Sequence, residues 1–325
     1  MLKRFLSAAL VPFLIAACSA PASHGGPVAS PPPPVPVEAG GVVSAADPRA
    51  AEAGAEMLRK GGSAADAAIA VMLALTVVEP QSSGIGGGGF YLHSTPDGDV
   101  ETIDGRERAP QAAGPDWFLG EDDAPLGYME AVLGGRSVGV PGNIALAALA
   151  HERHGKLAWA ELFQPAIALA RDGYVLTKRG REFLERAKNR AAHDPEGSAL
   201  YFGADGEPVP AGTLVRNPAL AATLQKIASE GPQAFYSGTF AAGLAEEIAE
   251  ATSGAARMTA SDIAEYEATP RDPVCGTYRA YRICGMGPPS SGATTVFAIL
   301  KQLERFDLAS MGPDSATFWH VFAES

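Results

Sequence analysis

The sequence is poor in cysteine and histidine, and it has no concentrated positive charge. Among its 325 residues there are three cysteines and six histidines, and no H-E-x-x-H motif occurs. We therefore expect no metal site and no metal cofactor. The formal net charge is −12 without any basic run, which argues against nucleic acid as a partner.

One pair of histidines has a spacing that could bring two side chains to the same face of a helix. His151 and His154 are three residues apart, and the charged residues Glu152 and Arg153 lie between them. This composition is typical of the solvated end of a helix. We expect both histidines to face solvent.

The first forty residues have the composition of an export and anchoring segment. Lys3 and Arg4 precede an apolar run that is too short to span a membrane, and small residues lead directly to Cys18. This pattern predicts a lipoprotein signal peptide over residues 1–17, with Cys18 lipidated in the mature protein. We therefore expect a protein of the cell envelope that faces the periplasm and is held at a membrane by its lipid.

Residues 18–40 are rich in proline and poor in apolar side chains, which predicts an extended tether. The folded region then begins near residue 41 and continues to residue 325. Loss of Lys3 and Arg4 with the signal peptide changes the formal charge from −12 to −14, so the exported form is acidic.

Cys275 and Cys284 lie in a segment that reads as two short strands joined by a turn. Outside the cytoplasm such a pair often forms a disulfide. A bridge across the hairpin and two buried thiols are both compatible with the sequence.

Helical and strand patterns are mixed along the rest of the chain, which indicates an α+β or α/β layered fold. Asp47 and Pro48 mark a helix start, and Ser63 with Asp66 forms a capping box before an apolar helix at residues 64–78. Strands are expected at residues 90–94 and 100–104, joined as a hairpin by a turn at residues 96–98, with Arg106 just past the second strand. Two more are expected at residues 273–278 and 281–286. Further helices are expected at residues 143–154, 157–171, 178–192, 217–230, 239–251 and 293–305.

Five of the six residues from Gly84 to Gly89 are glycine. Formally they match G-x-G-x-x-G, but a dinucleotide site needs a strand before the glycines and a helix after them. The order in this chain is reversed, which excludes a nicotinamide or flavin cofactor. Tight packing between helix and strand is the favoured reading of the run, and backbone N–H groups near a substrate are the other.

Two serine-containing segments resemble nucleophile motifs only in part. Residues 135–139 match G-x-S-x-G around Ser137, but no helix begins directly after them, as a nucleophile elbow requires. Ser290 and Ser291 follow two prolines and are expected to cap a helix. None of these serines is expected to be catalytic.

Several motifs, in the same order along the chain, resemble the γ-glutamyltranspeptidase family. They are the glycine run, the Arg-Glu-x-Ala-Pro pattern at residues 106–110, Val-Gly-Val-Pro-Gly at 138–142, the segment at 155–162 and Pro-Pro-Ser-Ser-Gly at 288–292. The resemblance covers residues 40–325. It implies the four-layer αββα sandwich of the N-terminal-nucleophile hydrolases, incomplete in this chain.

The resemblance also implies a chemistry. Such a protein is a γ-glutamyltransferase and glutathione hydrolase, made as a precursor that cuts itself into two subunits. Arg106 matches the arginine that holds the α-carboxylate of the γ-glutamyl group, and Glu107 would orient it. The nucleophilic threonine is expected beyond Ser325, so this chain alone should be inactive. No organic cofactor is implied.

Two other functions remain open from the sequence. One is a related amidase, such as a cephalosporin acylase or a capsule poly-γ-glutamate transferase, because a shared fold does not determine the substrate. The other is a lipid-anchored binding protein without catalysis. The residues that follow Ser325 would distinguish them, since a Thr-Thr-His sequence there favours the enzyme.

Overall fold

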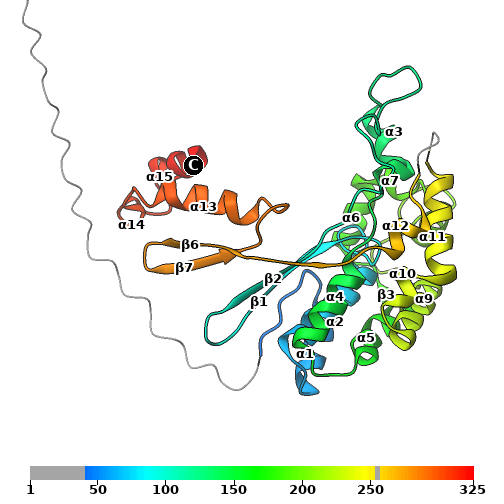
Figure 1. The fold of residues 1–325 in the computed structure, drawn as a ribbon, viewed down its shortest axis with the longest axis horizontal. Coiled ribbons are helices and arrows are strands. Elements are labelled where there is room, and N and C mark those ends of the chain that lie inside the picture. Colours follow the sequence, from blue (N-terminus) through cyan, green and yellow to red (C-terminus); the bar gives the residue numbers. More distant parts are fainter. Residues whose placement is uncertain (1–40, 253–256) are drawn as a thin grey trace, which may run out of the picture.

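The computed structural model describes residues 41–252 and 257–325. The expected signal peptide, the lipidated Cys18 and the tether lie outside these residues. The part described is α+β (Figure 1), with a helical body formed by α1 to α12 and a C-terminal segment formed by residues 274–325.

The helices of the body are α1 (Pro48–Arg59), α2 (Ala64–Val78), α3 (Tyr128–Leu133), α4 (Asn143–His154), α5 (Trp159–Asp172), α6 (Lys178–Arg186), α7 (Lys188–Ala191), α8 (Pro195–Tyr201), α9 (Pro218–Glu230), α10 (Gln233–Tyr236), α11 (Gly238–Glu250) and α12 (Ala260–Ala264). Its strands are β1 (Gly89–Ser94), β2 (Val100–Gly105), β3 (Tyr174–Val175), β4 (Leu214–Val215) and β5 (Thr269–Arg271). The C-terminal segment contains β6 (Val274–Tyr278), β7 (Tyr281–Gly285), α13 (Gly292–Leu303), α14 (Leu308–Met311) and α15 (Ala316–Glu324).

Helix α2 lies at the centre of the helical body, as its apolar sequence predicts. Only Ala64 and Ala68 are exposed along it, and Leu73 and Ala74 are fully buried. It packs against α1, α4 and α5, so most of its circumference is covered. An apolar helix can be stable in water only in such a position.

The capping box at the start of α2 extends into a longer connection. Asp66 is fully buried, and its Oδ2 accepts hydrogen bonds from the backbone N–H groups of Ser63, Lys156 and Leu157. The carboxylate thereby joins the first turn of α2 to the loop between α4 and α5. The expected capping box is confirmed. The bonds from Asp66 to Lys156 and Leu157, about ninety residues further along the chain, were not expected.

The strands β1, β2 and β5 form one antiparallel sheet with β2 in the middle. The hairpin expected at residues 90–94 and 100–104 is confirmed, with Gly89 opposite Gly105. Strand β5 comes from residues far along the chain and pairs with the end of β2, where Thr102 donates its hydroxyl to the carbonyl oxygen of Arg271. The end of β2 is therefore fixed on both sides.

The C-terminal segment projects from the helical body beyond the β1–β2 hairpin (Figure 1). Helix α13 covers one face of the β6–β7 hairpin and contacts α15. No helix in the part of the chain that the structure describes is long and apolar enough to cross a membrane.

Element boundaries differ from the expectations mainly where the signal is short. The helix expected at residues 178–192 divides into α6 and α7 at Ala187. Strands β3 and β4, of two residues each, were not expected, because two residues are too few to show an alternating pattern.

Candidate functional site

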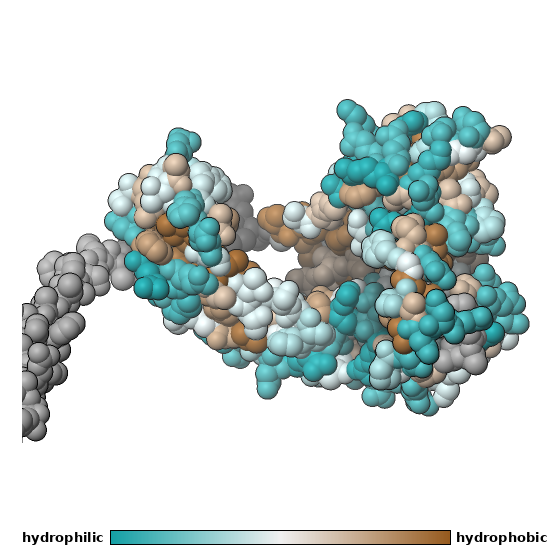
Figure 2. Space-filling view, turned by 90° about the horizontal axis from the view of Figure 1, so that it is seen from above, coloured by the Kyte–Doolittle hydropathy of each residue, from teal (hydrophilic) through white to brown (hydrophobic). Residues whose placement is uncertain are grey.

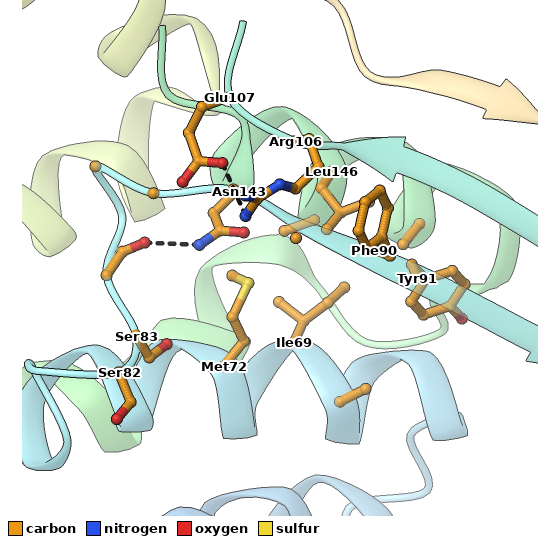
Figure 3. A pocket seen from close by; sticks show the side chains of 18 of the residues that line it. Ile69, Met72, Ser82, Ser83, Phe90, Tyr91, Arg106, Glu107, Asn143 and Leu146 are labelled. Carbon is orange, nitrogen blue, oxygen red and sulfur yellow. Dashed lines mark hydrogen bonds and ion pairs between the residues drawn. The ribbon is translucent and has the colours of Figure 1, made fainter. Parts of the chain in front are cut away.

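A cavity of about 630 Å³ lies between α2, the glycine run, β1 and α4 (Figure 3). Its lower wall in that view is the apolar face of α2, including Ile69 and Met72, and Phe90 and Tyr91 close one side. Arg106 and Glu107 contribute the charged groups. Burial raises the pKa of Tyr91 to about 12, so its hydroxyl remains protonated at neutral pH.

The glycine run forms one edge of this cavity and also packs tightly in one place. A Cβ on Gly88 would lie 2.5 Å from the carbonyl oxygen of Gly105 and 2.6 Å from the backbone nitrogen of Glu107. A Cβ on Gly86 would have no atom within 4 Å. The favoured interpretation, tight packing, therefore applies to Gly88, whereas Gly86 borders open space in the cavity.

These two glycines provide a matched pair of variants. Gly88→Ala should lower the free energy of unfolding by about 1–3 kcal/mol, because backbone atoms would have to move to admit the methyl group. Gly86→Ala should change it by less than about 0.5 kcal/mol. Thermal or denaturant unfolding of the two variants beside the parent chain measures both values. Equal losses would mean that Gly88 does not pack against β2 as described.

Asn143, the first residue of α4, fixes the glycine run from the other side. Its Nδ2 donates to the carbonyl oxygen of Gly84. The backbone N–H groups of Gly142 and Asn143 both donate to the carbonyl oxygen of Gly87. The side chain is almost entirely buried, and it lines the cavity. The sequence did not single out this residue. A polar side chain at a helix start after the Val-Gly-Val-Pro-Gly segment was the available signal.

Arg106 and Glu107 lie together at the charged end of the cavity. Nη1 of Arg106 is 3.1 Å from Oε2 of Glu107. The arginine side chain is 52% exposed and the glutamate side chain 29%, so the guanidinium borders the cavity while its partner is more enclosed. This geometry lets Glu107 orient the guanidinium while the Arg106 side chain lines the cavity (Figure 3).

The backbone of Arg106 is held more firmly than its side chain. Its N–H donates to Oδ1 of Asp104, and its carbonyl oxygen accepts a hydrogen bond of 2.6 Å from the hydroxyl of Tyr266. The other oxygen of Asp104 lies 2.7 Å from Nε of Arg271 in β5. Burial raises the pKa of Tyr266 to about 12, which keeps this hydroxyl a donor at neutral pH.

Tyr266 is positioned in turn by a second tyrosine. Its ring stacks on that of Tyr236 at a centroid distance of 5.9 Å. Tyr236 donates its hydroxyl to the carbonyl oxygen of Pro141 and accepts from the N–H of Ala145. Two tyrosines therefore connect Arg106 to the start of α4. Neither was found from the sequence, since no local pattern marks a contact across 160 residues.

The two histidines of α4 were interpreted wrongly. His151 is bonded through Nε2 to the carbonyl oxygen of Leu157, and its side chain is 22% exposed. His154 is 17% exposed, stacks on His93 at 3.9 Å and bonds to Glu101. The strand hairpin packs over this end of α4, and the sequence alone could not show that cover. Within residues 41–252 and 257–325, no group of three His, Cys, Asp or Glu side chains could hold a metal ion.

The serines of the partial nucleophile motifs have structural partners. Ser137 ends a single 3₁₀ turn, and its hydroxyl donates to the carbonyl oxygens of Val132 and Gly134. The hydroxyl of Ser290 accepts from the N–H of Gly292 at the start of α13. Ser291 is the N-cap residue of α13, but its side chain makes no capping hydrogen bond, so the cap expected from this side chain is wrong.

A profile of the γ-glutamyltranspeptidase family matches residues 50–325. The chain belongs to the γ-glutamyltranspeptidase family. It is 36% identical over 285 residues to the glutathione hydrolase proenzyme of Escherichia coli, an alignment that covers 88% of this chain and 48% of that protein. The chain thus spans about half the length of this curated relative.

Two solved structures show the same fold. The γ-glutamyltranspeptidase of Helicobacter pylori superimposes with a TM-score of 0.82 at 34% identity, covering 90% of this chain and 82% of that chain. The transpeptidase CapD of Bacillus anthracis gives 0.72 at 33% identity, covering 88% and 89%. The expected α+β fold of an N-terminal-nucleophile hydrolase is therefore confirmed, over part of the relatives' chains.

Proposed function

We propose that the protein containing this chain is a γ-glutamyltransferase and glutathione hydrolase, and that residues 41–325 form the donor-binding part of its large subunit. The observation that carries this proposal is the placement of Arg106. Its guanidinium borders a cavity of suitable size and is oriented by Glu107, while its backbone is fixed on both sides. A planar, permanently charged group in a fixed position suits a carboxylate.

In the proposed reaction, Arg106 binds the α-carboxylate of a γ-glutamyl donor. The nucleophile is a threonine hydroxyl supplied by the second half of the precursor, as the family resemblance implies. It attacks the γ-amide carbonyl and releases the amine, forming a γ-glutamyl ester. Water or an acceptor amine then attacks the ester and regenerates the hydroxyl. Arg106 contributes by positioning, because it is bound to a group remote from the reacting carbon.

The proposed partner is the small subunit produced by self-cleavage. Large apolar side chains are exposed on the C-terminal segment, and brown surface is visible on both parts of the molecule in Figure 2. In the C-terminal segment these residues are Tyr281, Val296, Phe306, Trp319 and Phe322, each at least 40% exposed. Apolar surface of this kind supports a protein partner.

The test is to extend the chain past Ser325 with the second half of a family member. We expect the product to cut itself into two fragments and to hydrolyse a chromogenic γ-glutamyl anilide, whereas residues 1–325 alone should do neither. A cleaved, folded product that hydrolyses other acyl amides, and no γ-glutamyl donor, would contradict the proposal and favour the related amidases.

We also propose that Cys18 carries a lipid that holds the protein at a membrane. Cys18→Ala should release it from the membrane fraction or block removal of the signal peptide. Phase partitioning in detergent measures this directly. A variant that still partitions with lipoproteins would show that Cys18 is not the anchor.

A further inference from the structure

The β6–β7 hairpin carries a disulfide on its open face. Cys275 and Cys284 are directly opposite each other in the hairpin and are bonded. Their neighbours Gly276 and Gly285 face α13, since a Cβ at either position would contact Phe297 or Ala293. Side chains alternate between the faces of a strand, so the disulfide lies on the face away from α13. Cys275 is exposed, and Cys284 is partly buried.

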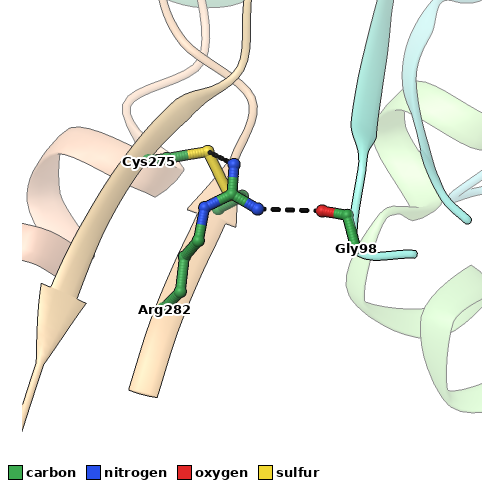
Figure 4. The surroundings of a disulfide bond; sticks show 4 residues. Gly98, Cys275 and Arg282 are labelled. Carbon is green, nitrogen blue, oxygen red and sulfur yellow. Dashed lines mark hydrogen bonds between the residues drawn. A yellow bond between two sulfur atoms is a disulfide. The ribbon is translucent and has the colours of Figure 1, made fainter. Parts of the chain in front are cut away.

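An arginine, Arg282, lies against this disulfide. Nη2 of Arg282 is 3.4 Å from Sγ of Cys275, and its Nη1 donates to the carbonyl oxygen of Gly98 in the turn between β1 and β2 (Figure 4). The second hydrogen bond fixes the guanidinium beside the sulfur. The hydrogen bond to sulfur is made to Cys275, so the cation is held against this sulfur.

We propose that Cys275–Cys284 is a thiol–disulfide exchange site for small-molecule thiols, with Cys275 as the leaving group. The incoming thiolate attacks Sγ of Cys284. A new S–S bond forms between the small thiol and Cys284, the bond between the two cysteines breaks, and its electron pair leaves on Cys275 as a thiolate. A second thiol molecule can then displace Cys284, giving a small-molecule disulfide and two reduced cysteines.

Arg282 determines the direction of the attack. Exchange is faster when the departing sulfur is the more stable thiolate, and a neighbouring arginine stabilises a thiolate. Stabilisation of the Cys275 thiolate therefore favours attack on Cys284, the less exposed of the two cysteines. This inference does not depend on the proposed γ-glutamyl chemistry, because the exchange needs neither Arg106 nor a catalytic threonine.

The test is exchange of the folded 325-residue chain with millimolar reduced glutathione, stopped at short times with an alkylating reagent. Trypsin cuts after Arg279 and separates the two cysteines, so mass spectrometry reads each one independently. We expect glutathione on Cys284 and the alkyl group on Cys275. Arg282→Gln should slow the exchange by about tenfold and remove the preference. The exchange rate of Arg282→Lys should lie between those of the parent chain and Arg282→Gln.

Arg305→Gln is the matched control, because it removes the same charge from an exposed position of the C-terminal segment outside the hairpin. It should leave the rate and the site of attack unchanged. A melting curve of each variant confirms that the comparison is made between folded proteins. Glutathione found first on Cys275, equal rates for the parent and Arg282→Gln, or no exchange before the chain unfolds would each overturn the proposal.

Discussion

Arg106→Lys, in a version of the protein restored with a homologous second half, should lower kcat/KM for a γ-glutamyl donor by about 30- to 1000-fold. Lysine keeps the charge but loses the planar pair of N–H donors, so the loss measures geometry. A charge-assisted bidentate contact is worth on the order of 2–4 kcal/mol. The two hydrogen bonds to the backbone of Arg106 do not involve the substituted side chain, so the backbone of the site should stay in place.

A donor analogue without the α-carboxylate distinguishes a binding role from a structural one. The parent protein should use it poorly, and Arg106→Lys should change its hydrolysis little. The kcat/KM values of the two proteins with the two donors form a double-mutant cycle. Its coupling energy reports the contact between Arg106 and the carboxylate. Self-cleavage should be unaffected, since it needs no donor. Additive losses, without coupling, would return Arg106 to the role of a surface partner of Glu107.

The largest expected effect on stability comes from Asp66. Asp66→Ala should lower the free energy of unfolding by about 3–5 kcal/mol, because three backbone N–H groups lose their acceptor in a buried place. Chemical denaturation of the 325-residue chain measures the loss. The substitution should also disturb the wall of the cavity, because Ala68, Ile69 and Met72 of the same helix line it.

Ser63→Ala is the control for this prediction. It removes the other half of the capping box, in which Ser63 accepts from the N–H of Asp66, but leaves the carboxylate and its three donors. Loss of a cap alone should cost about 1 kcal/mol. If the two variants were equally destabilised, Asp66 would be acting as a helix cap only, and the connection to residues 156 and 157 would carry no stability.

The parts of the fold that were predicted correctly depend on neighbours in sequence. Asp47 and Ser63 cap their helices as expected, since a cap needs only the next three residues. The β1–β2 hairpin followed from alternation and a turn. The position of Arg106 at the end of β2 could be predicted for the same reason, and the resemblance to the family supplied its proposed role.

The parts that were missed depend on residues brought together by the fold. Tyr266 holds the carbonyl of Arg106 from 160 residues away, and nothing near either residue indicates the other. The stack of His93 on His154 arises because a hairpin happens to cover the end of a helix. The hydrogen bond from Lys156 to Asp66 likewise joins residues that are far apart in the sequence. Local patterns identify elements, but contacts between elements require the tertiary structure.

The position of β5 has a consequence for the order in which the molecule is built. Arg106 emerges early in translation. Tyr266, which binds its carbonyl oxygen, and Arg271 of β5, which pairs with Asp104, are made about 160 residues later. During that interval the Arg106 end of the cavity has only the glycine run, β1, α2 and α4 around it. Closing so long a loop is slow compared with forming local helices. The surroundings of Arg106 are therefore completed only after the helices between β2 and β5 have been made.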